Sequence, residues 1–201
     1  MDRWATFDCY GTLVDWNAGI CSVVGDELLA RYHEVEPEVQ VEQPSLSYRD
    51  VMREVLRRID FADADALGRS LPGWPVFPEV PAALAAARAD GWKLAILSNT
   101  DRDFIEASMA SIGVPFELAI VASEVGSYKP ALGHWRAFEG KVGRLPDVHV
   151  AASHFHDVVP ASELGIPTVW VNRLAESGDP APTRELRDLS LLRETLDELV
   201  A

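Results

Sequence analysis

Short apolar segments alternate with helical segments over most of the chain, and this alternation constrains the fold most strongly. Five segments have the composition of buried strands, namely 4–11, 93–99, 117–123, 148–153 and 167–172. The segments between them have helical spacing, and several end at a glycine. Fully apolar strands joined by helices are typical of a parallel sheet covered on both faces. We therefore predict an α/β fold.

Residues 15–78 interrupt the alternation. A helix can form over 15–33, and the following residues are polar and broken by prolines. The segment 48–59 has helical spacing, with Val51, Val55, Leu56 and Ile59 on one face. A shorter helix over 63–71 leads to a proline-rich return. We predict a small helical insertion between the first strand and the rest of the sheet.

Two further helices are predicted from their terminal signals and their spacing. The helix over 100–113 would begin at Thr100 as its N-cap and end at Gly113. After a polar loop over 173–183, the segment 184–200 is predicted to form one amphipathic helix.

The composition excludes several classes of function. The net charge of −14 argues against a surface that binds nucleic acid or anionic lipid. No apolar run approaches the roughly 20 residues of a membrane span. Cys9 and Cys21 form no disulfide framework or zinc pattern, and the N-terminal residues lack a signal-peptide layout. We expect a cytoplasmic protein that binds neither nucleic acid nor membranes.

Polar residues follow four of the predicted strands or the loops after them. They are Asp8 to Thr12, Ser98–Asn99, Lys129–Pro130 and His154 to Asp157. In parallel α/β sheets, ligands bind beyond the carboxyl ends of the strands. Folding could therefore bring all four segments to one rim.

An aspartate at a strand end before a glycine turn is a reasonable covalent nucleophile. Gly11 lets the backbone bend sharply and leaves room for a ligand, and the Thr12 hydroxyl can orient neighbouring groups. Lys129 could neutralise an anion or keep Asp8 ionised. Ser98 and Asn99 offer uncharged donors. Alternatively, these residues could be ordinary turn-formers, and Lys129 a plain loop lysine.

Asp157 has several roles open to it. Its carboxylate could bind a metal, hold Lys129 or position a water molecule. It could also be no more than the N-cap of the following helix.

Four motifs, "FDCYGTL", "LSNTD", "SYKP" and "HFHD", resemble those of the haloacid dehalogenase superfamily in order and spacing. The resemblance extends from Trp4 to about Arg173. Within the superfamily, Asp-x-Tyr-Gly-Thr resembles the L-2-haloacid dehalogenase branch. It implies a Rossmann-like core, made of 1–14 and 79–201, with a helical cap over 15–78.

The resemblance also implies roles for individual residues. Asp8 would be the nucleophile, and Thr12, Ser98, Lys129 and Asp157 would complete the catalytic set. Tyr10, Asn99 and His154 would contact the substrate. Dimers through the cap occur in related dehalogenases, so a homodimer is a further expectation.

Tyr10 stands where phosphatases of the superfamily carry a second aspartate. That acid protonates an alkoxide leaving group, and general acid catalysis contributes roughly 10² to 10⁴ in rate. A phenol with a pKa of about 10 is a much weaker acid. Halide needs no proton to leave, so Tyr10 favours cleavage of a carbon–halogen bond. Tyr10 could also simply pack.

We therefore predict a hydrolase that forms an aspartyl ester at Asp8 on a small anionic organic molecule, without a cofactor. One alternative is a magnesium-dependent phosphatase, with Asp8, the Tyr10 carbonyl and Asp157 as ligands. Another is a weakly catalytic binding protein on the same scaffold.

Several positions differ from the dehalogenase pattern. Where the dehalogenases carry a cap arginine that grips the halide, the best match here is Gln40. Ala152 and His154 stand at places usually held by serine and asparagine, and Trp135 replaces an expected tyrosine. His154 or His156 could act as base for the water that cleaves the ester, or could hold an anion. The substrate-facing set is therefore altered, while the nucleophilic machinery is retained.

Overall fold

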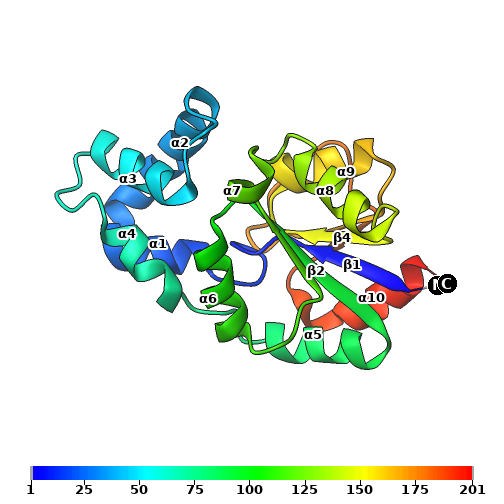
Figure 1. Cartoon of the computed structure of the whole chain (residues 1–201). Helices are drawn as coiled ribbons and strands as arrows, with labels where there is room; N and C mark the ends of the chain where they lie inside the picture. Colours follow the sequence, from blue (N-terminus) through cyan, green and yellow to red (C-terminus); the bar gives the residue numbers. More distant parts are fainter. Residues whose placement is uncertain (1, 201) are drawn as a thin grey trace.

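The computed structural model describes residues 2–200, and its centre is a parallel sheet of six strands in the order β3-β2-β1-β4-β5-β6. The strands are β1 (Arg3–Phe7), β2 (Trp92–Ser98), β3 (Leu118–Val121), β4 (Val148–Ala151), β5 (Thr168–Val171) and β6 (Arg184–Leu186). The predicted α/β fold is confirmed (Figure 1). Strand order changes direction between β1 and β4, and this switch point is where such sheets bind ligands.

Helices cover both faces of the sheet (Figure 1). On one side are α5 (Val80–Ala89) and α10 (Leu192–Leu199), and on the other are α8 (Gly133–Val142) and α9 (Val159–Glu163). Alternate side chains of β2 pack against the helices on opposite faces of the sheet. Leu94 and Ile96 belong to the larger apolar cluster, whereas Ala95 and Leu97 pack in a second cluster that contains Trp135. The period of two along a strand explains this division.

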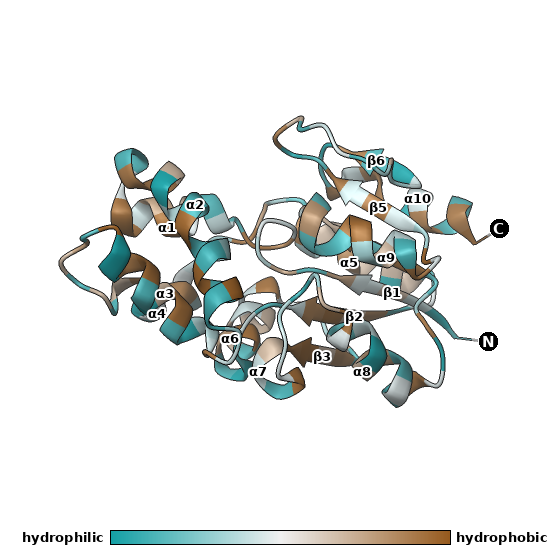
Figure 2. Cartoon of the chain, turned by 90° about the horizontal axis from the view of Figure 1, so that it is seen from above, coloured by the Kyte–Doolittle hydropathy of each residue, from teal (hydrophilic) through white to brown (hydrophobic). Residues whose placement is uncertain are grey.

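Hydropathy follows the same layering. Figure 2 shows β2 and β3 as strongly hydrophobic strands, with polar and apolar residues mixed on the helices that surround them. The connecting helices α6 (Arg102–Ile112) and α7 (Ala122–Val125) follow these two strands. Within residues 2–200, no helix has both the length and the apolar character needed to cross a bilayer.

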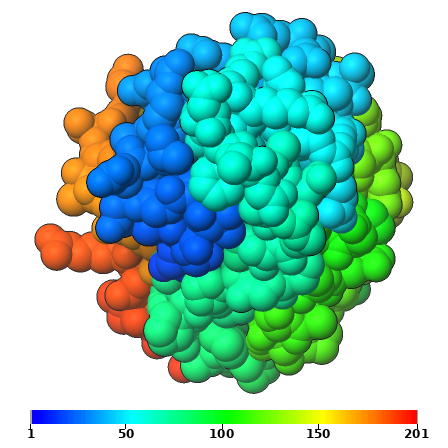
Figure 3. Space-filling model, turned by 90° about the vertical axis from the view of Figure 1, so that its left-hand side faces the viewer, coloured from blue at the N-terminus to red at the C-terminus, as the bar shows by residue number. Residues whose placement is uncertain are grey.

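A group of helices lies beyond one end of the sheet and joins the chain between β1 and α5 (Figure 1). We call this group the cap. Its members are α1 (Trp16–Val24), α2 (Asp26–Glu42), α3 (Tyr48–Arg58), α4 (Ala66–Ser70) and the short helix η1 (Leu71–Gly73). They fall inside the predicted range 15–78. Seen from that end, the cap fills the centre of the molecular surface (Figure 3).

The single helix predicted over 15–33 is wrong. Two helices occupy this region, separated at Gly25, whose φ is 77°. The second, α2, runs to Glu42 with Pro37 inside it, where a proline-broken segment was predicted. Tyr32, Val35 and Val39 are buried on α2, which packs on the buried face of α3. Most helical stability in proteins comes from such packing, so it outweighs the cost of the proline.

The prediction for the C-terminus is partly wrong. Arg184–Leu186 is not helical but forms the edge strand β6, paired with β5. The helix begins only at Leu192, after a single 3₁₀ turn, η3 (Leu189–Leu191), that Asp188 caps. A strand of three residues is too short to show the alternation of apolar and polar residues that identifies a strand. The helical pattern of the residues after it therefore led to a helix being predicted over β6 as well.

The cap is tied to the core by polar contacts near the end of β2. The predicted N-cap Thr100 is wrong by one residue, since Asp101 precedes α6. The Asp101 carboxylate bonds instead to the start of α3, accepting from the backbone N–H groups of Tyr48 and Arg49 at 3.0 and 2.9 Å. A second link runs from the Tyr128 hydroxyl to the Leu46 carbonyl, at 2.8 Å. Free N–H groups at a helix start favour a carboxylate, so Asp101 fixes the cap against the core.

Close packing inside the cap gives a stability prediction. A Cβ at Gly19 on α1 would lie 2.3 Å from the Trp74 ring, whereas a Cβ at Gly140 on α8 meets nothing within 4 Å. Overpacking costs typically 1–3 kcal/mol, so we expect Gly19→Ala to lower the free energy of unfolding by about that amount. Gly140→Ala should raise it by roughly 0.5–1 kcal/mol because alanine favours helix.

Urea unfolding followed by circular dichroism measures both variants. Equal stability of the two would contradict the packing described for the cap.

Candidate active site

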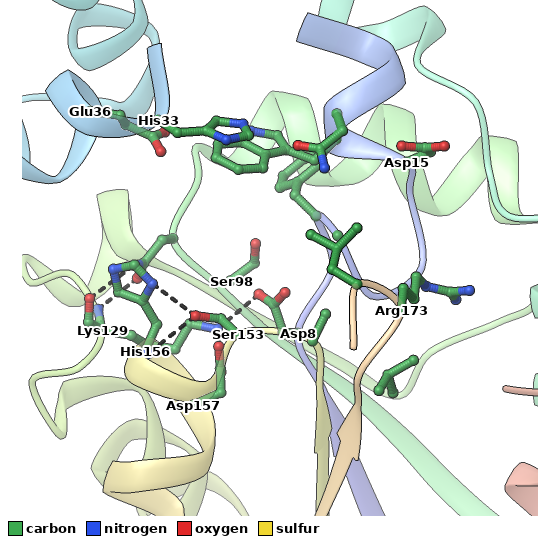
Figure 4. Close-up of a pocket in the computed structure, with 18 of the residues that line it drawn as sticks. Asp8, Asp15, His33, Glu36, Ser98, Lys129, Ser153, His156, Asp157 and Arg173 are labelled. Carbon is green, nitrogen blue, oxygen red and sulfur yellow. Dashed lines mark hydrogen bonds and ion pairs between the residues drawn. The ribbon is translucent and has the colours of Figure 1, made fainter. Parts of the chain in front are cut away.

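The four segments predicted to share a rim lie around one cavity. Asp8 follows β1, Ser98 ends β2, Lys129 lies in the loop after α7, and Asp157 follows β4. All four line a cavity of about 590 Å³ between the sheet and the cap. Figure 4 shows these side chains below the cavity, with residues of α2 above it.

Lys129 is the centre of the polar contacts at this rim. Its ammonium donates to Asp8 Oδ1 at 2.8 Å, to Asp157 Oδ1 at 2.6 Å and to the Leu97 carbonyl at 2.9 Å. The residue is only 2% exposed. An ammonium has three protons, so these three acceptors satisfy it completely. A buried charge of this kind is tolerated only when it is paired and hydrogen-bonded.

Burial and charge shift the three ionisable groups differently. Burial raises the pKa of Asp8, and Lys129 opposes this shift only in part. Burial also raises the pKa of Asp157, but the charge of Lys129 and the hydrogen bond of His149 outweigh it and lower the pKa to about 2. Burial lowers the pKa of Lys129, but both carboxylates outweigh it and the net shift is upward. Asp157 and Lys129 therefore remain charged.

Thr12 orients Asp8 from the other side. Its hydroxyl donates to Asp8 Oδ2 at 3.0 Å and accepts from the Ala152 backbone N–H at 2.9 Å. The turn before it requires Gly11, whose φ is 89° and lies in a region that side chains rarely adopt. Both oxygens of Asp8 are thus fixed, one by Thr12 and one by Lys129.

Ser98 and Asn99 differ in whether their side chains are free to bind a ligand. The Asn99 amide donates to the Lys129 carbonyl at 3.0 Å and accepts from the Lys129 backbone N–H at 2.6 Å. Asn99 therefore holds the lysine loop, while its side chain still lines the cavity. The Ser98 hydroxyl is buried and has no partner within residues 2–200. It is the uncharged group at this rim that remains free for a ligand.

His149 supports Asp157 from inside the sheet, and the sequence analysis missed it. Its Nε2 lies 2.9 Å from Asp157 Oδ1, and its Nδ1 lies 2.8 Å from the Thr6 hydroxyl. Trp135, at the place of an expected tyrosine, packs edge-on against this imidazole and is fully buried outside the cavity. A polar residue within the apolar segment "VHVAAS" was the available signal.

Tyr10 packs between cap and core. Its hydroxyl lies 3.0 Å from the Ser108 hydroxyl on α6, and its ring contacts those of Tyr48 and Trp74. Burial raises the pKa of the phenol further. Tyr10 lines the cavity with its ring, but its hydroxyl is engaged elsewhere and is a poor proton donor.

The structure places His154 outside the cavity, contrary to the predicted substrate contact. Its Nε2 lies 2.9 Å from the Pro180 carbonyl, and its ring packs on Trp170. His156 lines the cavity instead, with Nδ1 3.0 Å from the Ser153 hydroxyl. Burial lowers the pKa of His156, which leaves it neutral near pH 7. The first turn after Ser153 is a π-helical turn, η2 (His154–Val158), and the sequence could not specify which histidine it would turn inward.

The opposite wall comes from one face of α2. His33, Glu36 and Gln40 line the cavity there, at helical spacings of three and four. The indole of Trp16 stacks on His33 with ring centroids 4.7 Å apart. Glu36 was missed because Pro37 concealed the helix. Had the helix been predicted, the position of Glu36 on the same face as the buried residues Tyr32, Val35 and Val39 would have identified it as a buried carboxyl group.

Arg173 closes the cavity near β5. Its guanidinium donates to the Thr12 carbonyl at 2.9 Å and to Glu79 at 2.7 Å, and it lies 3.6 Å from the centre of the Phe77 ring. The resemblance ended at this residue without giving it a role. Arg173 thus links the turn after β1 to the start of α5.

Asp8 and Asp157 are the carboxylates that a magnesium ion at this rim would use. Within residues 2–200 no cluster of three His, Cys, Asp or Glu side chains is arranged to hold a metal. In the part of the chain that the structure describes, Asp157 Oδ2 is the one oxygen of these two carboxylates that has no hydrogen-bond partner. Magnesium prefers octahedral oxygen coordination. A carboxylate oxygen accepts more than one contact, so Asp8 and Asp157 could hold the ion, with the Tyr10 carbonyl as the expected third ligand, while Lys129 stays bound to both.

The chain matches a known family over most of its length. The model of the haloacid dehalogenase-like hydrolases matches residues 3–151. The (S)-2-haloacid dehalogenase of Pseudomonas sp. strain YL is 30% identical over 193 residues, covering 83% of this chain and 81% of the relative.

Two further similarities bear on the fold and the chemistry. A phosphoserine phosphatase of Thermus thermophilus is 32% identical over 128 residues, covering 62% of this chain; the chain spans about half of that relative, 51%. The structure of the L-2-haloacid dehalogenase from Xanthobacter autotrophicus with chloropropionic acid covalently bound matches with a TM-score of 0.85 at 19% identity, covering 98% of this chain and 99% of that one. The second match shows a shared fold.

The buried Glu36 predicts a dependence of stability on pH. Burial raises its pKa from 4.5 to about 7. The folded state therefore binds more protons between these values, and stability is full below pH 4.5 and falls as the pH rises through 7. One pKa unit corresponds to about 1.4 kcal/mol, so we expect Glu36→Gln to be more stable than wild type by about 3 kcal/mol at pH 8.

Urea unfolding between pH 4.5 and 8 measures the difference, which should vanish at the acidic end. Glu38→Gln, an exposed site on the same helix, is the matched control and should leave the wild-type pH profile unchanged. A constant difference between Glu36→Gln and wild type would contradict the raised pKa.

Proposed function

The chain belongs to the haloacid dehalogenase-like hydrolases, and from this premise we propose that it cleaves a bond to carbon by nucleophilic attack of Asp8. The observation that carries the proposal is the placement of Asp8. Its two carboxylate oxygens are held by Thr12 and Lys129, and it lines the cavity between sheet and cap. A nucleophile fixed in this way loses little entropy on reaching its attack geometry.

The first step is displacement at carbon. An oxygen of Asp8 attacks the substrate carbon, the bond to the leaving group breaks, and the leaving group departs with the electron pair. The product is an ester between Asp8 and the organic acid. Lys129 and Thr12 orient the carboxylate, and the free Ser98 hydroxyl can donate to the substrate carboxylate. Because Tyr10 is a poor proton donor, the leaving group should need no proton, as is true of halide.

The second step is hydrolysis of the ester. Water attacks the Asp8 carbonyl carbon, and the alcohol oxygen leaves with the hydroxy acid, so that Asp8 is restored with one oxygen from water. Neutral His156 lines the cavity and can accept the proton of the attacking water. Asp157 keeps Lys129 charged and in place. The step requires no cofactor.

A magnesium-dependent phosphatase is the second candidate. Two observations favour it: the similarity to the Thermus thermophilus phosphoserine phosphatase, and the unpartnered Oδ2 of Asp157. The missing second acid weighs against it, because Tyr10 is a poor proton donor. We further propose a cytoplasmic setting for the enzyme; a homodimer through the cap stays a prediction.

Isotope labelling tests the nucleophile. Single turnover of 2-chloropropionate in H₂¹⁸O should place one heavy oxygen in the peptide that contains Asp8, as read by mass spectrometry. Asp8→Asn should lower halide release by at least roughly 10³-fold, since the nucleophile is lost.

The same preparation is assayed for phosphate release from an aryl phosphate with magnesium or EDTA. Phosphate release that requires magnesium, without halide release, would overturn the proposed reaction in favour of the phosphatase.

The two histidines of the fourth motif give a paired test. His156→Ala should lower kcat by roughly 10² or more because general base catalysis is lost. His154→Ala, two residues away but outside the cavity, should change kcat by less than about threefold. Steady-state halide release measures both, and equal losses would refute the assignment of His156 as base.

A further inference from the structure

The cavity is lined by more carboxyl groups than cations. Asp8, Asp15, Glu36, Asp157 and Glu176 face it, against Lys129 and Arg173. Both cations are already committed, Lys129 to Asp8 and Asp157, and Arg173 to Glu79. Burial lowers the pKa of His33 and of His156, so neither adds a charge near neutral pH. The cavity is therefore suited to a ligand that brings positive charge with it.

Glu36 is the buried carboxyl group of the cavity that has no positively charged side chain paired with it within residues 2–200. It is 7% exposed. The Tyr48 hydroxyl opposes the effect of burial on the pKa of Glu36 only in part. A buried carboxylate without a cation is costly, so a structure that keeps one at a cavity wall points to a partner from outside the chain.

Other groups on the same wall fit a cation. His33 Nε2 is buried and finds no hydrogen-bond partner among residues 2–200, and Gln40 lies one turn beyond Glu36 on the same face. The aromatic rings of Trp16 and Tyr48 also line the cavity. Aromatic faces and oxygen acceptors together are the usual surroundings of a bound ammonium.

The core wall offers a hydrogen-bond donor for the other end of such a ligand. There the Ser98 hydroxyl has no partner within residues 2–200, whereas the Lys129 ammonium is already bound to Asp8 and Asp157. Figure 4 shows Glu36 and His33 across the cavity from Ser98, Asp8 and Lys129. The two walls would hold the two ends of one molecule.

We propose that Glu36 is a specificity-determining residue that binds an ammonium group, and that the substrate is a small aliphatic amino carboxylate. Its reacting end lies at Asp8 and its amine lies against the cap. The identity of the reacting end rests on the proposed function, whereas the ammonium subsite does not. A carboxylate at the cap wall also disfavours a halide lodged there, in contrast to the arginine that dehalogenases place in this region.

Binding of unreactive probes tests the subsite without turnover. At pH 7.5, isothermal titration compares β-alanine, 4-aminobutyrate and 5-aminovalerate with propionate, butyrate and valerate. We expect at least one amino carboxylate to bind wild type at least tenfold more tightly than its amine-free counterpart, as a charge-assisted contact allows. Glu36→Gln should reduce this preference to within about twofold, and Glu38→Gln should preserve it.

Three outcomes overturn the proposal: no preference in wild type, no binding of any amino carboxylate, or an undiminished preference in Glu36→Gln. Thermal unfolding of each variant confirms that the folded protein is being measured. Asp8→Asn separates the two proposals, because it should abolish halide release while keeping the preference for the amine. If Asp8→Asn remained active while the preference persisted, the proposed reaction would fail and the subsite would stand.

Discussion

The ammonium of Lys129 is the interaction on which the rest of the site depends. It bonds to Asp8 directly after β1, to Leu97 in β2 and to Asp157 in the turn η2 beyond β4. It thus joins the carboxyl ends of three neighbouring parallel strands. Removing it would leave two carboxylates buried side by side, which costs several kcal/mol. The same contact fixes the orientation of Asp8. The contacts that hold the three strand ends together and the contact that orients the Asp8 carboxylate therefore come from one ammonium group.

Further residues hold Lys129 and its partners in place. Asn99 holds its backbone on both sides, and His149 fixes the carboxylate that faces it. Above it, Asp101 fastens the cap by the start of α3, only a few residues beyond Ser98. The core wall of the cavity and the position of the cap above it are therefore both fixed by residues just beyond β2. Such support is what holds reacting groups within the narrow tolerances of catalysis.

The sequence predicted five of the six strands and the cap helix α3, but it missed the cap helix α2 and the strand β6, for physical reasons. Buried parallel strands produce apolar runs and end in polar residues, so β2 and its Ser98 could be located directly. The helix α2 could not, because Pro37 and a polar composition conceal a buried face that exists only through packing on α3. The strand β6 and the inward turn of His156 depend on tertiary contacts that no local pattern carries. These errors concern segments whose structure is fixed by tertiary packing, and two of them, α2 and the turn with His156, line the cavity.

The face of α2 that lines the cavity would contact the substrate without taking part in the chemical step, two tasks that many enzymes assign to the same residues. His33, Glu36 and Gln40 lie on a helix that contributes none of the groups that hold Asp8, namely Thr12 and Lys129. Single substitutions on this face would alter what is bound while leaving Asp8, Thr12 and Lys129 undisturbed. New specificities could therefore arise by point mutation in a lineage without a loss of the underlying reaction, which makes α2 the part of this protein most open to evolutionary change and to redesign.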